Sequence, residues 1–105
     1  MSNSINDRKA EIFKALSNPA RLDIIDQLLE GEKCVCEIQA ALEKYEQPHI
    51  SKSLAKLKSA GLIKDRREGM NVYYSLTICC SVEFFTCLNK ILNGESPESA
   101  CKDHL

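Results

Sequence analysis

The sequence lacks any apolar run that approaches the roughly 20 residues of a membrane-spanning helix. Its opening residues, MSNSINDRKAEIF, also lack the apolar middle region of a secretory signal. Internal repeats and low-complexity segments are absent as well. These absences argue against membrane proteins and repeat arrays, and we expect a cytoplasmic protein without a membrane partner.

The chain also lacks the excess of positive charge that a uniformly basic nucleic-acid binder carries, because its net charge is −1. The basic residues are nevertheless concentrated: between Gln47 and Arg67, six lysines and arginines stand against Asp65 alone. Acidic residues gather instead between Asp23 and Glu37 and near the C-terminus. One basic face on a slightly acidic molecule suits docking on DNA in a single orientation.

No nucleophile, general base and orienting group occur together at the spacing of a catalytic motif, so we expect no enzymatic activity. The 105 residues suffice for one domain with a modest core. We assign residues 1–94 to this domain and residues 95–105 to a flexible polar tail. The alternative of a protein-interaction module that never touches DNA is disfavoured by the basic segment described above.

The most informative stretch, Gln47 to Leu62, has the pattern of a short amphipathic helix. Pro48 suits the first helical turn, where its missing N–H has no intrahelical partner. Ile50, Leu54 and Leu57 follow at spacings of four and three, which gives one apolar stripe. Hydroxyl and ammonium groups occupy the other faces. Taken alone, such a helix fits a solvent-exposed position as well as it fits DNA.

Three helices are predicted before this stretch, over residues 6–16, from Asn18-Pro19 to Gly31, and over residues 35–43. Asn18 followed by Pro19 is a strong helix start, because an N-cap side chain precedes a proline at the first helical position. The short loop before Gln47 makes the third and fourth helices a helix-turn-helix. The buried positions predicted for the second and third helices are Leu22, Ile25, Leu28, Leu29, Ile38, Ala41 and Leu42.

After Gly61 the apolar pattern changes to a period of two. Residues 62–67 and 71–76 are predicted to be strands joined through Glu68-Gly69-Met70, and a last helix is predicted between Thr77 and Gly94. The hairpin is the wing of a mainly α, winged helix-turn-helix fold.

Three segments in this order, ALSNPARLDIIDQLLEGEKCVCEI, QPHISKSLAKLKSAGLI and REGMNVYYSL, resemble the ArsR/SmtB family of small metal-sensing transcription regulators. The resemblance covers about Ile12 to Leu76. It implies a homodimer, paired through its first and last helices, that binds an operator and releases it when an inducer binds. DNA binding itself is expected to need no cofactor.

A symmetric dimer predicts an imperfect palindromic operator in double-stranded DNA, because its two recognition helices lie about one turn of DNA apart. Gln47 and His49 lie at the helix entrance, where side chains reach base edges. The remaining candidate DNA contacts suit phosphates or the minor groove: Ser51, Lys52, Ser53, Lys56, Arg66 and Arg67. Each of them is equally compatible with an ordinary solvent-exposed surface.

Six cysteines in such a chain favour metal ligands, redox thiols or core residues over a disulfide framework. Cys34 and Cys36 resemble the Cys-Val-Cys segment that ligates a soft ion in members sensing As(III), Cd(II) or Pb(II). Residues i and i+2 of a regular helix point about 200° apart, so both sulfurs reach one ion only where the helix is irregular or unwinds. The third cysteine of the arsenic sensors is replaced here by Gln39.

The candidate additional ligands are Cys79 and Cys80, at the start of the last helix, and Cys101. Cys87 lies roughly 10 Å from Cys80 along a helix axis and is expected in the core. Between Thr77 and Gly94 there is no aspartate or histidine, so the zinc and nickel site of the family is excluded and thiophilic inducers remain.

Two alternatives to a metal inducer remain open. One is a redox or sulfur sensor that uses the same thiols without metal, and the other is a regulator whose cysteines are only structural. The apolar face of the last helix has little core left to cover it except a partner subunit. Its residues Phe84, Phe85, Leu88 and Leu92 are therefore the predicted dimer interface.

Overall fold

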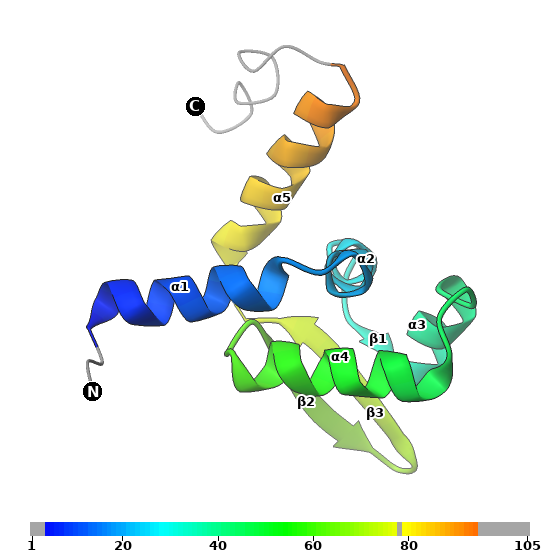
Figure 1. The fold of residues 1–105 in the computed structure, drawn as a ribbon. Coiled ribbons are helices and arrows are strands. Elements are labelled where there is room, and N and C mark those ends of the chain that lie inside the picture. Colours follow the sequence, from blue (N-terminus) through cyan, green and yellow to red (C-terminus); the bar gives the residue numbers. More distant parts are fainter. Residues whose placement is uncertain (1–3, 78, 95–105) are drawn as a thin grey trace.

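The computed structural model describes residues 4–77 and 79–94, so the predicted tail at 95–105 lies outside the described residues. The described part contains five helices and three strands. In chain order these are α1 (Ile5–Leu16), α2 (Pro19–Leu28), β1 (Lys33–Cys34), α3 (Val35–Ala41), α4 (Gln47–Ser59), β2 (Ile63–Glu68), β3 (Asn71–Leu76) and α5 (Cys79–Leu92) (Figure 1). None of these helices is both long and apolar enough to span a bilayer. The predicted winged helix-turn-helix is confirmed.

Local capping signals explain where the first two helices begin. The Ser4 side chain accepts a hydrogen bond from the Asp7 backbone N–H at 3.1 Å, and Asn18 Oδ1 accepts one from the Ala20 N–H at 2.9 Å. Each bond satisfies a helix N–H that has no intrahelical acceptor. The predicted start of α2 at Asn18-Pro19 is therefore confirmed.

The core lies where α2, α3 and α4 meet the hairpin. Its fully buried side chains are Ile24, Ile25, Ile38, Ile50, Leu57 and Ile63. Two predicted core positions are wrong: Leu22 is 39% exposed, and Ala41 is exposed at the end of α3. On α2 the inward face instead passes through Ala20, Ile24 and Leu28, which follow one another at intervals of four.

The three strands form an antiparallel sheet in the order β1-β3-β2. The hairpin register runs from Ile63 opposite Leu76 to Glu68 opposite Asn71, and Gly69 turns the chain with a φ of +64°. β1 contributes only Lys33 and Cys34, which pair with Tyr74 and Tyr73. This strand fixes Cys34 against the wing immediately before α3 begins.

The last helix extends away from the rest of the subunit, as Figure 1 shows. Phe85 anchors it to the core, because its side chain is only 8% exposed and belongs to the core cluster. The prediction of Phe85 as an interface residue is therefore wrong: it packs within its own subunit. The other predicted interface residues, Phe84, Leu88 and Leu92, are 53%, 39% and 79% exposed.

Candidate nucleic-acid interface

The turn between α3 and α4 is tied to the helices on either side of it. Tyr45 Oη donates a hydrogen bond to Asp23 Oδ2 on α2 at 2.7 Å, and Gln39 Nε2 on α3 donates one to the Tyr45 carbonyl at 2.9 Å. The hydrogen bond to Asp23, together with burial, raises the pKa of Tyr45 above its ordinary value. The Tyr45 ring also meets the His49 ring edge-on, with centroids 5.1 Å apart. Sequence reasoning missed this contact set, which positions the entrance of α4.

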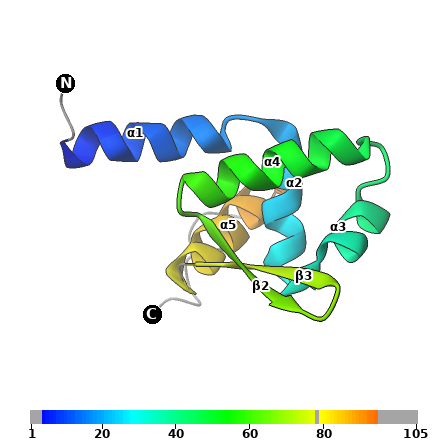
Figure 2. The ribbon, with the colours of Figure 1, turned by 90° about the horizontal axis from the view of Figure 1, so that it is seen from below.

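The exposed surface of α4 has two flanks, because each helical residue turns about 100°. Gln47 and Ser51 lie on the flank nearest the hairpin, together with Lys58, whose Nζ is 3.0 Å from Asp65 Oδ2 on β2. The opposite flank carries His49, Lys52 and Lys56, which recur at spacings of three and four. Figure 2 shows α4 between the hairpin and α1. The predicted contacts Gln47, His49, Ser51, Lys52 and Lys56 are all solvent-exposed, and their binding to DNA stays a prediction.

Ser53 does not share this exposure. It is 4% exposed and lies beside Ile50 and Leu54 on the inward side of α4. Its hydroxyl cannot reach DNA from that position, so the prediction of Ser53 as a DNA contact is wrong. The reason is geometric: an offset of three residues from Ile50 returns the side chain to the face that packs against the core.

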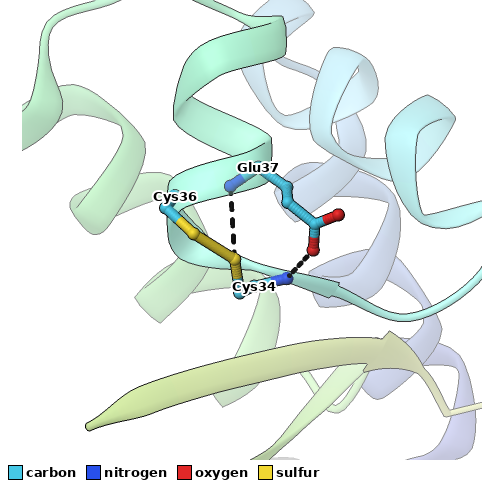
Figure 3. Close-up of a disulfide and its surroundings, with 3 residues drawn as sticks. All are labelled: Cys34, Cys36 and Glu37. Atoms are coloured by element: carbon cyan, nitrogen blue, oxygen red, sulfur yellow. Dashed lines mark hydrogen bonds between the residues drawn. A yellow bond between two sulfur atoms is a disulfide. The ribbon is translucent and has the colours of Figure 1, made fainter.

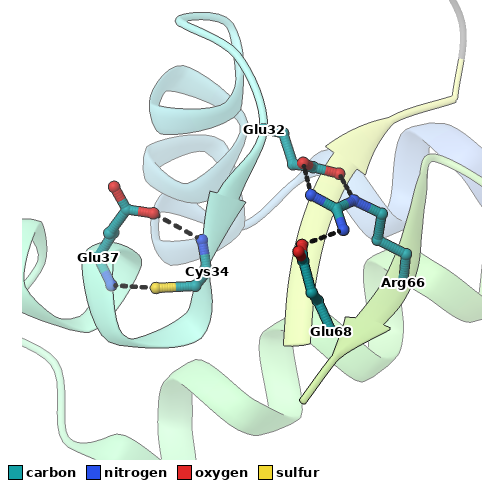
Figure 4. A network of polar contacts seen from close by, with 5 residues as sticks. All are labelled: Glu32, Cys34, Glu37, Arg66 and Glu68. Carbon is teal, nitrogen blue, oxygen red and sulfur yellow. Dashed lines mark hydrogen bonds and ion pairs between the residues drawn. The ribbon is translucent and has the colours of Figure 1, made fainter. Parts of the chain in front are cut away.

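The two arginines predicted on the wing are in different environments. Arg66 Nε and one Nη donate to the Glu32 carboxylate at 2.8 and 2.7 Å, and its other Nη lies 2.7 Å from Glu68 Oε2 (Figure 4). The guanidinium also lies over the Tyr73 ring, 4.7 Å from its centroid. The hydrogen bonds from Arg66 lower the pKa of the Glu32 carboxyl, and those same bonds with the bond to Glu68 raise the pKa of Arg66. Two carboxylates therefore balance the charge of this arginine.

Arg67 lies on the other face of the hairpin, because successive strand residues alternate in direction. That face also carries Asp65, which pairs with α4 through Lys58. Among the ion pairs of the described residues, none engages Arg67. Its charge is therefore available to a phosphate, whereas Arg66 would first have to leave Glu32 and Glu68.

Cys34 and Cys36 are joined by a disulfide at the start of α3 (Figure 3). Cys34 is the N-cap residue in an extended conformation, so it precedes the helix, while Cys36 lies in the first turn. The Cys34 Sγ accepts from the Glu37 N–H at 3.4 Å, and the Cys34 N–H donates to Glu37 Oε1 at 2.9 Å. The irregularity that the two sulfurs need is thus built into the helix boundary, and α3 does not have to unwind for them to meet.

A groove of about 560 Å³ lies between this cysteine pair and the start of α4. Cys34, Cys36 and Gln39 line one side, Gln47 lies at the start of α4, and Met70 and Asn71 belong to the hairpin turn and β3. Met70 is fully exposed at the end of the wing. A group bound to the two sulfurs, or a change in their bonding, would therefore act beside the predicted base-reading residue Gln47.

The other predicted ligands lie in the C-terminal part of the sequence. Cys79 and Cys80 begin α5 as predicted, but their side chains, like the whole of Cys101, lie outside the described residues. Cys87 is partly exposed on α5. Within the described part of the chain, no group of three or more histidine, cysteine, aspartate or glutamate side chains could hold a metal ion.

The sequence matches the model of a known protein family and several individual proteins. Residues 18–65 match the model described as "Bacterial regulatory protein, arsR family". The chain is 46% identical over 67 residues to the transcriptional repressor SmtB homolog of Synechocystis sp. and 44% identical over 68 residues to the arsenical resistance operon repressor of Escherichia coli. Each match covers 64% of this chain, but only 50% and 57% of the respective relative. The chain therefore matches little more than half the length of these two proteins.

A solved structure extends the similarity to the whole fold. The homodimeric winged helix-turn-helix DNA-binding domain Mb0332 from Mycobacterium bovis, described as a possible ArsR-family transcriptional regulator, superposes with a TM-score of 0.75 at 30% identity. The superposition covers 100% of this chain and 98% of that domain.

Proposed function

Because the chain belongs to the ArsR family of bacterial regulatory proteins, we propose that it is a homodimeric repressor. Its affinity for operator DNA is controlled at Cys34 and Cys36. The observation that carries this proposal is the single groove that Cys34, Cys36 and Gln47 share. One chemical change there acts directly beside a residue that reads DNA. Such a protein works where the DNA is, in the cytoplasm, and carries out no catalysis.

For the DNA side, Gln47 and His49 reach base edges from the entrance of α4. Ser51, Lys52, Lys56 and Arg67 hold phosphates on either side and fix the register without reading sequence. No cofactor is required, since every group in this set belongs to the chain. The exposed apolar residues of α5 support pairing of two subunits, which would present two copies of α4 to an imperfect palindrome.

The first candidate signal is a soft ion such as As(III), Cd(II) or Pb(II). In the reduced protein, Cys34 and Cys36 supply two thiolates at the start of α3. The Cα atoms of the two residues lie 5.4 Å apart in the disulfide-bonded structure. The Glu37 N–H that Cys34 Sγ accepts also favours a negative sulfur. A third donor would come from Cys79, Cys80 or Cys101. The E. coli relative, named for arsenical resistance, supports this class of inducer.

The second candidate signal is oxidation, which the Cys34–Cys36 disulfide supports. Closing this bond removes two electrons and two protons from the two thiols, and a peroxide accepts them to give water. The disulfide removes both sulfurs as ion ligands. The two signals therefore compete for the same pair of cysteines, and reduction is required before an ion binds.

A first test distinguishes a residue that recognises the base sequence from a residue that contacts phosphates. Gln47→Ala should weaken binding to the operator about tenfold, the effect of about 1.4 kcal/mol, with little change on unrelated duplex DNA. Lys52→Ala should weaken both kinds of DNA alike and lower the salt slope by about 2, because each of the two subunits loses one phosphate contact. Fluorescence anisotropy titrations between low and high salt measure both effects. Absence of DNA binding by the reduced wild-type protein at low salt would refute the proposal.

A further inference from the structure

A second, basic cleft lies on the flank of α4 that faces away from the wing. It has a volume of about 670 Å³ and is formed by α1, the start of α2 and the C-terminal part of α4. Four basic side chains line it, against one carboxylate from Glu11: Arg8, Lys14, Arg21 and Lys56. Figure 2 shows α1 and α4 running side by side at this place. The surplus of positive charge makes the cleft a candidate for an anionic partner.

The charges in this cleft are not neutralised within the subunit. Among the ion pairs of the described residues, none engages Arg8, Lys14 or Lys56, and all three side chains are exposed. Arg21 donates from one Nη to the Ala15 carbonyl at 3.0 Å, but its Nε is buried without a hydrogen-bond partner in the described part of the chain. By contrast, Arg66 on the wing is paired with two carboxylates.

The cleft continues the surface that α4 presents to DNA. His49, Lys52, Lys56 and Ser59 follow one another at spacings of three, four and three, so they form one stripe along the helix. Lys56 and Ser59, at the end of this stripe, are also lining residues of the cleft. The stripe therefore leads from the predicted base-reading end of α4 directly to Arg8 and Lys14 on α1.

We propose that this cleft binds the sugar-phosphate backbone of the same DNA whose bases α4 reads, an inference that rests on the proposed DNA binding. A helix inserted in the major groove, which is about 12 Å wide, has a phosphate backbone on each side. On one side of α4 the wing offers Arg67. On the other side the cleft offers Arg8, Lys14 and Lys56, so α1 becomes part of the DNA interface as well as of the fold.

The test compares neighbouring residues of α1 that differ only in the face they occupy. Arg8→Gln/Lys14→Gln should weaken binding to operator and unrelated duplexes by the same factor. Because both subunits of the dimer carry the two substitutions, the salt slope should fall by about 4, or about 1 for each lost phosphate contact. Lys9→Gln removes a charge next to Arg8 but outside the cleft and should leave the slope at the wild-type value. Arg8→Lys should retain the slope, because it retains the charge. Sedimentation velocity checks that every variant remains the wild-type oligomer, and either single variant replaces the double one if that fails.

Three results would overturn the inference. One is a wild-type slope in the double variant while Lys52→Ala lowers it, which leaves DNA binding intact and removes only the cleft from the interface. Another is an equal loss in Lys9→Gln, which would reflect net charge alone. The last is a rise in melting temperature with inorganic phosphate at constant ionic strength that disappears in the double variant while the salt slope does not change. That result would assign the cleft to a free anion. Failure of the wild-type protein to bind any DNA would refute the proposed function instead.

Discussion

Exchange of Phe84 and Leu88 for glutamate is expected to give a folded monomer that binds its operator at least about a hundredfold more weakly than the wild-type dimer. Both side chains are exposed on one face of α5, at 53% and 39%, and they are four residues apart. Two carboxylates there would have to be desolvated for the subunits to pair. A monomer then holds one half-site and loses the advantage of binding both half-sites together. Sedimentation velocity and anisotropy with full and half operators measure the two consequences.

Two controls on the same helix separate dimerisation from folding. Thr86→Glu adds a charge on the opposite side of α5 and should leave the dimer intact. Phe85→Ala should cost about 3–5 kcal/mol of unfolding free energy, because Phe85 belongs to the subunit core. The folded fraction of the Phe85→Ala variant should still dimerise. An unchanged dimer in the double-glutamate variant would place the interface elsewhere, with the exposed Ile5 and Phe13 of α1 as the next residues to test.

The parts of the fold that were predicted correctly depend on signals between near neighbours in the chain. Asn18 and Pro19 mark the start of α2, and the spacing of Ile50, Leu54 and Leu57 defines the inward face of α4. The strand β1 was missed because two residues carry no period, and only pairing with β3 makes them a strand. Tertiary contacts likewise decided that Ile24 rather than Leu22 is buried. An amphipathic pattern identifies the buried face of a helix. The elements packed against that helix determine which residues at the border of this face are buried.

The candidate site also contains both contacts that nearby residues signal and contacts between residues distant in the sequence. Arg66 was predicted as a DNA contact, but its partner Glu32 is 34 residues away in the sequence and no local pattern connects them. Glu68 was accessible to reasoning, because it is two residues from Arg66 on the same strand and therefore shares its face. The position of Cys34 before α3 also had a signal. Glu37 follows it at the spacing of a capping box, as glutamate does after a capping serine or threonine.

That capping role shapes the test of the cysteine pair. Cys34→Ser/Cys36→Ser should keep α3 intact, because a serine hydroxyl accepts the Glu37 N–H as the sulfur does. Cys34→Ala, which removes the acceptor, should instead cost about 1 kcal/mol of stability. The double-serine protein is therefore expected to bind operator DNA as tightly as the reduced wild type. Circular dichroism and thermal unfolding check that any lost response is not a folding defect.

In the reduced wild-type protein, As(III) or Cd(II) is expected to lower operator affinity by a factor between about 5 and 150, the range of a coupling of about 1–3 kcal/mol. The double-serine variant should show no such change, because it has lost both thiolates beside Gln47. Cys87→Ser serves as the matched cysteine control and should respond as the wild type does. Cys79→Ser/Cys80→Ser should reduce the response only if one of those sulfurs supplies the third donor. Oxidation predicts a different pattern: peroxide alone releases the DNA, and a dithiol reductant restores binding. A double-serine protein that still responds fully to the ion would exclude Cys34 and Cys36 as the sensing site and make Cys79 and Cys80 the residues to examine.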